Sequence, residues 1–202
     1  MTKIKLCGLK RMQDIEYVNK LLPEYVGFVF APKSKRYVDF RTAQSLREHL
    51  HKDITPVGVF VNESVENIKY LVQNNIISMV QLHGSEDNAY ISALRRAVSC
   101  PLIKAFRIDT PDDIIKANNS GADFVMLDSG GGTGKLFDHS LISDIRRSFF
   151  LAGGLDSNNV ADIISTVLPY AVDASSCLET DGVKDMIKMT AFVNAVRQGG
   201  KI

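Results

Sequence analysis

Short apolar runs recur along the chain, and segments with a helical spacing of apolar residues separate them. The runs are rich in Val, Ile, Leu and Phe and have the length of buried β-strands. They lie at residues 4–7, 26–30, 57–61, 79–82, 102–106, 124–128, 149–152 and 171–174. Each run therefore predicts one strand of a sheet that is covered on both faces.

The segments between the runs predict amphipathic helices, because their apolar residues recur every three or four positions and polar residues fill the rest. These apolar residues are Ile15, Val18 and Leu22; Ala43, Leu46 and Leu50; Val65, Ile68 and Val72; Ile91, Leu94 and Val98; and Met186, Met189, Val193 and Val196. A start signal agrees with this interpretation: Thr110 precedes Pro111 and two aspartates. That order supplies a cap, a first-turn proline and negative charge at the positive end of a helix.

An alternation of strand and helix throughout the chain, with eight strands, predicts an α/β fold, the closed (β/α)₈ barrel. The chain of 202 residues is short for this fold, so its loops must be tight. No linker or low-complexity stretch divides it, and we expect a single barrel domain spanning residues 1–202. In such barrels the carboxyl ends of the strands carry the chemistry.

Composition narrows the classes of function. The chain is 45% hydrophobic and 23% charged, with a net charge of +1, and its largest basic cluster is residues 32–36. This balance argues against a nucleic-acid or membrane partner and leaves a small anionic ligand possible. No segment approaches the apolar length of a membrane span, so we expect a cytoplasmic protein. The three cysteines, Cys7, Cys100 and Cys177, are too few and too far apart for a disulfide framework or a metal cluster.

Polar residues or glycines follow nearly every predicted strand. Gly153 and Gly154 come after the seventh strand, and Ser175 and Ser176 come after the eighth. Loops at these two places in a barrel often bind a phosphate through backbone N–H groups. A glycine pair alone is equally compatible with a plain tight turn, but the serine pair on the neighbouring strand favours a phosphate site.

Asp128 ends an otherwise apolar run. A carboxylate there either caps a turn or acts as a general acid whose pKa is raised by partial burial. The stretch that follows, residues 129–137 with the sequence SGGGTGKLF, is typical of a flexible lid that hinges at its glycines. Its order of glycines and lysine does not match a Walker phosphate loop.

Three further strand-end residues each allow a structural and a functional interpretation. Cys7 is either an inert buried thiol or, at a barrel mouth, a thiolate base. Arg36 is either part of a solvated basic loop or a fork that binds a substrate carboxylate. His83 is either an acid, base or ligand, or a histidine hydrogen-bonded for architecture, and the two are about equally supported.

Taken in order, these motifs resemble the phosphoribosylanthranilate isomerase family. The matching stretches are KIKLCGL, GFVF with SKRYV, VGVFVN, VQLHG, MLDS with GGTGKLFD, LAGGL, and VDASSCLE with GVKD. They extend over essentially the whole chain. Each stretch is short, but the ordered set is highly specific. In SSCLE, Cys177 stands where the family usually has glycine, and we expect it to crowd the phosphate loop.

The resemblance implies an Amadori rearrangement of N-(5-phosphoribosyl)anthranilate to 1-(2-carboxyphenylamino)-1-deoxyribulose 5-phosphate, a step of tryptophan biosynthesis. It implies Asp128 as the general acid, Cys7 as the general base, and no metal or other cofactor. Arg36 would bind the anthranilate carboxylate, and His83 would contact the substrate. The phosphate would be bound by the glycine and serine pairs, Gly153, Gly154, Ser175 and Ser176. The environments of the acid and the base should then shift their pKa values in opposite directions.

The sequence also leaves two other functions to be considered. A histidine-pathway aminoaldose isomerase is a related phosphosugar barrel, but it resembles a two-fold repeat with paired aspartates, whereas the first strand here ends in Cys7. A phosphate-binding protein without catalysis would have no use for both Cys7 and Asp128. Either a monomer or a homodimer is compatible with the composition.

Overall fold

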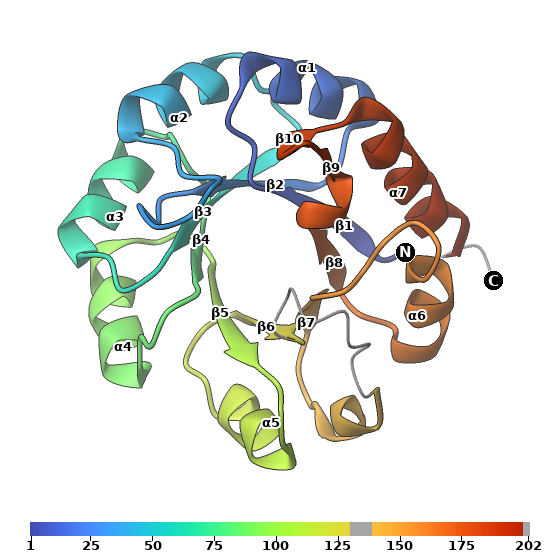
Figure 1. The fold of residues 1–202 in the computed structure, drawn as a ribbon. Helices are drawn as coiled ribbons and strands as arrows, with labels where there is room; N and C mark the ends of the chain where they lie inside the picture. The colour runs from blue at the N-terminus through green and yellow to red at the C-terminus, as the bar shows by residue number, and fades with distance from the viewer. Residues whose placement is uncertain (130–138, 200–202) are drawn as a thin grey trace.

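The structure is a computed structural model that describes residues 1–129 and 139–199. Eight parallel strands form a closed barrel in chain order, in which the first strand pairs with both the second and the eighth. Helices surround the strands as an outer ring, and the C-terminal helix lies between the first and sixth helices (Figure 1). The predicted (β/α)₈ barrel is confirmed.

All eight predicted strands are present within a few residues of their expected ends. They are β1 (Lys3–Cys7), β2 (Tyr25–Val29), β3 (Thr55–Phe60), β4 (Met79–Leu82), β5 (Leu102–Arg107), β6 (Phe124–Asp128), β7 (Phe149–Ala152) and β8 (Ala171–Ala174). A short two-stranded sheet, β9 (Glu179–Thr180) with β10 (Val183–Lys184), follows the barrel. It lies beside the end of β1 and contributes to the site below.

Of the seven α-helices described in the outer ring, the apolar spacing predicts five, the start signal at Thr110 predicts a sixth, and the helix Val160–Val167 was not singled out. The seven are α1 (Met12–Leu21), α2 (Phe40–Glu48), α3 (Val65–Gln73), α4 (Asn88–Ala97), α5 (Pro111–Asn118), α6 (Val160–Val167) and α7 (Met186–Gly199). The start of α5 is a capping box between Thr110 and Asp113, as its sequence indicates. No helix in the described parts of the chain is long and apolar enough to cross a membrane.

The expectation of a strand followed by an α-helix throughout is wrong at one place. Between β6 and β7, the described part of the connection forms a 3₁₀ helix, η1 (His139–Asp144). Its apolar contact with the core comes from Leu141, Ile142 and the following Ile145. This stripe is too short to specify several turns of amphipathic helix.

Side chains alternate between the inside and the outside of the barrel, as the two-residue period of a strand requires. The inner cluster fills the barrel with Tyr25, Val57, Met79, Ile103, Ala105, Met126, Phe150, Ala152 and Ala171. A second inner group, Cys7, Val29 and Val59, lies nearer the carboxyl ends of the strands. The intervening residues of each strand pack outward against the helices. The inward residues at the carboxyl ends are therefore the ones that face a barrel-mouth ligand.

Candidate active site

Cys7 and Asp128 are the last residues of β1 and β6, and both belong to the inward-facing set of their strands. Cys7 lies two residues after the inward Lys5, and Asp128 lies two residues after Met126 of the inner cluster. The thiol is buried, and the carboxylate side chain is 19% exposed. The fold thus brings both predicted acid–base residues to the carboxyl end of the barrel, where the sequence places them.

A glycine in β2 makes room for the Cys7 thiol. Gly27 pairs with Cys7 in the sheet, and a Cβ atom added to it would lie 2.5 Å from Cys7 Sγ. A side chain at this position would push the sulfur out of its place. A glycine inside a strand is a recognised signal of such close approach, and it is the signal by which Gly27 could have been singled out.

The pKa of Cys7 shifts in the direction opposite to that expected. Desolvation by the surrounding core raises the pKa of the thiol, and the positive charges of Lys5 and Lys184 offset only part of this effect. The ligand-free chain therefore holds Cys7 as a thiol at neutral pH. The expectation of a lowered pKa was wrong because burial outweighs the nearby cations.

Asp128 faces His83 across the mouth of the barrel. The distance from His83 Nε2 to Asp128 Oδ2 is 3.5 Å. On the other side of the ring, the Gln81 side-chain amide donates to His83 Nδ1 at 3.0 Å. Because Nδ1 accepts this hydrogen bond, a neutral ring carries its proton on Nε2, toward Asp128. The structure thus places His83 beside Asp128, the candidate acid, and Gln81 orients the imidazole ring.

A buried ion pair holds the loop that carries His83. Lys104 Nζ lies 3.0 Å from Glu86 Oε2, and both side chains are almost fully buried. The Glu86 carboxylate also accepts hydrogen bonds from the backbone N–H groups of Asn62 and Gly84, at 2.7 and 2.8 Å. The loops after β3 and β4 are thereby tied to β5, which fixes the backbone beside His83.

The glycine and serine pairs follow β7 and β8, as predicted, and their backbone N–H groups have no partner within residues 1–129 and 139–199. Gly153 and Gly154 have φ angles of +88° and +66°, which turn the chain sharply after β7. No hydrogen bond among the described residues uses the backbone N–H of Gly153, Gly154, Ser175 or Ser176. Adjacent unpaired N–H groups of this kind can bind an anion.

Two of these four residues also support the acid–base pair. A Cβ atom added to Gly153 would lie 2.7 Å from Asp128 Oδ1, so this glycine allows the carboxylate its position. The Ser175 hydroxyl donates to the backbone carbonyl of Cys7 at 3.0 Å. Its proton is thus engaged with β1, which leaves the backbone N–H as the donor that Ser175 could offer to a ligand.

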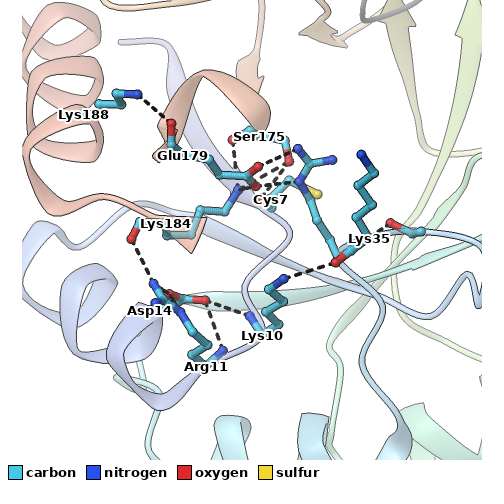
Figure 2. A network of polar contacts seen from close by, with 11 residues as sticks. Cys7, Lys10, Arg11, Asp14, Lys35, Ser175, Glu179, Lys184 and Lys188 are labelled. Atoms are coloured by element: carbon cyan, nitrogen blue, oxygen red, sulfur yellow. Dashed lines mark hydrogen bonds and ion pairs between the residues drawn. The ribbon is translucent and has the colours of Figure 1, made fainter. Parts of the chain in front are cut away.

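Arg36 is held by a carboxylate of the chain itself. Its Nε lies 2.6 Å from Glu179 Oε1, and its Nη2 lies 2.8 Å from Glu179 Oε2. Lys184 Nζ contacts the same carboxylate at 2.7 Å, so two cations share one anion beside Cys7 (Figure 2). Burial alone would raise the pKa of Glu179, but the hydrogen bonds from Arg36 and Lys184 outweigh it and lower the pKa. The group carries one net positive charge, which favours an anionic ligand.

Sequence reasoning missed several charged residues around Cys7. Lys5 and Asp173 form an ion pair inside the barrel, and Glu179 and Lys184 form the one beside it. Lys5 and Asp173 stand out as charged residues at inward strand positions, but their pairing is visible only once β1 and β8 are neighbours. The second pair lies in a short sheet that no periodicity predicts.

Of the two remaining cysteines, Cys177 lies near the charges of Lys184 and Asp173, which also act on Cys7. Cys100 and Cys177 are half-buried free thiols packed against the outer core. Burial raises the pKa of Cys177 to about 11, so it stays protonated at neutral pH. The expected crowding of the phosphate loop by Cys177 stays a prediction. The predicted lid, residues 129–137, lies almost wholly outside the described residues. Within those residues, no group of three or more His, Cys, Asp or Glu side chains could hold a metal ion.

The structure is a (β/α)₈ barrel with a thiol and a carboxylate at its mouth, the arrangement of a barrel enzyme. Residues 4–195 match the family model described as N-(5'phosphoribosyl)anthranilate (PRA) isomerase. A curated N-(5'-phosphoribosyl)anthranilate isomerase from Endomicrobium trichonymphae is 45% identical over 98% of this chain and 99% of its own. The chain therefore belongs to the N-(5'-phosphoribosyl)anthranilate isomerase family.

Solved structures agree with this assignment. Phosphoribosyl anthranilate isomerase from Thermotoga maritima has a TM-score of 0.89 at 33% identity, over 98% of this chain and 100% of that one. Another phosphoribosyl anthranilate isomerase structure, in complex with reduced 1-(o-carboxyphenylamino)-1-deoxyribulose 5-phosphate, has a TM-score of 0.86 at 32% identity, with the same coverage. This chain thus shares its fold with each of the two structures along nearly the full length of both chains.

Proposed function

We propose that the chain carries out its family's reaction, the Amadori rearrangement of N-(5-phosphoribosyl)anthranilate, with Asp128 as general acid and Cys7 as general base. One observation supports these roles: each residue is the last of its strand and faces the barrel interior at the carboxyl end. The family assignment supports the substrate, a small phosphosugar, over the histidine-pathway aminoaldose and over a binder without catalysis.

The first step is ring opening. Asp128 donates a proton to the furanose ring oxygen while the bond from this oxygen to C1 breaks. The nitrogen lone pair then forms the C1–N double bond of an iminium ion. His83, 3.5 Å from the carboxylate, is close enough to orient Asp128, and this position at the mouth supports its proposed contact with the substrate. The step needs a protonated carboxyl group within hydrogen-bond reach of the ring oxygen.

The second step is proton removal from C2. The iminium ion makes this proton acidic, and the Cys7 thiolate takes it. The C–H electron pair becomes the C1–C2 double bond of an enolamine while the π electrons of the C1–N bond return to nitrogen, and the enolamine tautomerises to the ketone. The thiol first loses its own proton to water. Because burial raises the thiol pKa in the ligand-free chain, formation of the thiolate depends on nearby positive charge. The iminium ion supplies such a charge when it forms beside Cys7.

The two anionic ends of the substrate match the two donor groups of the mouth. The unpaired N–H groups of Gly153, Gly154, Ser175 and Ser176 support a phosphate site. Arg36 keeps the edge formed by Nη1 and Nη2 for the anthranilate carboxylate, because Glu179 occupies its other edge. The three free thiols fit a reducing compartment, which supports a cytoplasmic location.

The test is an assay of turnover without added metal or cofactor. Phosphoribosylanthranilate is generated from anthranilate and phosphoribosyl pyrophosphate, and the loss of anthranilate-type fluorescence is followed. We expect a protein-dependent loss far faster than spontaneous hydrolysis. A rate equal to hydrolysis would contradict the proposed function and leave a phosphate-binding barrel without a reaction.

A further inference from the structure

Lys5 is a fully buried cation in the interior of the barrel. It lies in the middle of β1, pairs with Asp173 of β8 in the sheet, and its Nζ is 2.8 Å from Asp173 Oδ1. Cys7 lies two residues further along β1 and therefore faces the same interior. The positive charge of Lys5 acts on Cys7 and lowers the pKa of the thiol, against the larger effect of burial. The ammonium group thus lies between a carboxylate and the thiol.

Such a pair is an unusual component of a barrel core. Removing two charges from water costs several kcal/mol per ion, and apolar residues of similar volume often stabilise a core better. The neighbouring inward residues are in fact apolar or aromatic. Neither step of the proposed reaction uses Lys5 or Asp173 directly. Their position beneath Cys7 is therefore best explained by an effect on the thiol.

The charges that face the thiol come from four elements. Lys5 on β1, Lys184 on β10 and Arg36 in the loop after β2 are cationic, whereas Asp173 on β8 is anionic. Arg36 and Lys184 share the carboxylate of Glu179 at the mouth, and this partner reduces their effect on the sulfur. Lys5 is fully buried on the same inward face of β1 as Cys7, and its charge lowers the pKa of the thiol more than that of Lys184 does. It is the cation best placed to stabilise a charge on that sulfur.

We propose that Lys5 is a positioning residue for the general base: once the Cys7 thiol has lost its proton, Lys5 stabilises the thiolate as an ion pair until the thiolate takes the substrate proton, while Asp173 fixes the ammonium group beneath the sulfur. This inference rests on the proposed role of Cys7. When the proton passes from C2 to Sγ, the C–H electron pair enters the enolamine and the ion pair ends. Lys5 keeps all three of its protons throughout.

The experiment measures the thiol directly and turnover separately. In a Cys100→Ser, Cys177→Ser background, the rate of Cys7 alkylation by iodoacetamide is followed against pH for Lys5→Met and Lys5→Arg. We expect Lys5→Met to react about tenfold more slowly at pH 8, with its profile moved to higher pH, because thiolate formation loses its cation. The acid limb of kcat/KM should move the same way. Lys5→Arg keeps the positive charge, so its alkylation rate and pH profile should stay near those of the parent protein.

A control variant separates this effect from a loss of stability. Glu86→Gln breaks the buried ion pair with Lys104 on another part of the barrel and should leave the alkylation profile unchanged. If Lys5→Met does not fold, Lys5→Met with Asp173→Asn removes both charges and should shift the profile in the same direction, but less. An unshifted profile in either Lys5→Met protein would overturn the proposal. A shifted profile with unchanged kcat/KM would instead overturn the role of Cys7 as base.

Discussion

Arg36 and Glu179 form a two-point salt bridge in which each carboxylate oxygen accepts from a different guanidinium nitrogen, at 2.6 and 2.8 Å. This geometry fixes the plane of the guanidinium and leaves its Nη1 and Nη2 edge for a second carboxylate. A residue predicted to bind substrate is thus oriented by a partner that the sequence did not indicate.

Loss of Arg36 should weaken substrate binding more than chemistry. Arg36→Ala removes a charge-assisted pair of hydrogen bonds, so we expect KM to rise about 10- to 100-fold, with a smaller change in kcat. Glu179→Gln should raise KM less, because it loosens Arg36 without removing it. Lys35→Ala, at an exposed lysine of the same loop, is the matched control and should leave both constants unchanged. A drop in kcat at constant KM would contradict a binding role for Arg36.

The space that Gly27 leaves for the Cys7 sulfur should be essential for activity. A Cβ atom at Gly27 would lie 2.5 Å from Cys7 Sγ, so Gly27→Ala must displace the thiol or the strand. We expect at least a tenfold loss of kcat/KM and about 1–3 kcal/mol of destabilisation from overpacking. Gly121→Ala is the control, since its added Cβ would make ordinary contacts at 3.5 Å or more. Unimpaired turnover by Gly27→Ala would show that the position of the thiol is not critical.

The buried pair of Lys104 and Glu86 should contribute stability that depends on pH. Burial alone would raise the pKa of Glu86, but hydrogen bonds from the Asn62 backbone and from Lys104 outweigh it, and the pKa lies below its ordinary value of 4.5. A lowered pKa means that the folded state binds protons less readily than the unfolded state. The stabilisation is therefore complete above about pH 4.5 and is lost as the pH falls through the lowered value.

Urea unfolding of Glu86→Gln measures this contribution. At pH 7 we expect the variant to be about 3–5 kcal/mol less stable, because Lys104 is left buried without its partner. The difference from the parent protein should shrink as the pH falls below the ordinary range of a glutamate. Asp109→Asn is the control, because its ion pair with Arg107 is more than half exposed and should contribute little. A difference that stays constant with pH would contradict the account of Glu86.

The fold could be predicted because strand and helix signals repeat in the same order along the chain. Apolar runs such as residues 57–61 and capped helices such as the one at Pro111 each depend on local sequence, and the barrel is the closed arrangement that fits their number. The connection before Phe149 was mispredicted, since the stripe around Ile142 is too short to specify an α-helix.

Of the candidate site, only the residues at the ends of predicted strands could be predicted from the sequence. Cys7 and Asp128 end apolar runs, so their placement follows from the fold alone. The ion pairs of Lys5 and Glu179 can be recognised only when β1, β8 and β9 are brought together, because no local pattern encodes these pairings. The raised pKa of Cys7 was missed for the same reason, because the extent of burial is a property of the packed barrel.

The most direct test of the account is turnover and binding by Cys7→Ala and Asp128→Ala, with Cys100→Ser as the matched control. General acid and general base catalysis each contribute about 10²- to 10⁴-fold, so we expect kcat to fall by at least about 100-fold in both variants. The affinity for reduced 1-(o-carboxyphenylamino)-1-deoxyribulose 5-phosphate should stay within a few-fold of the parent protein, because other residues bind its ends. Turnover near the parent rate in either variant would contradict the assigned acid–base pair.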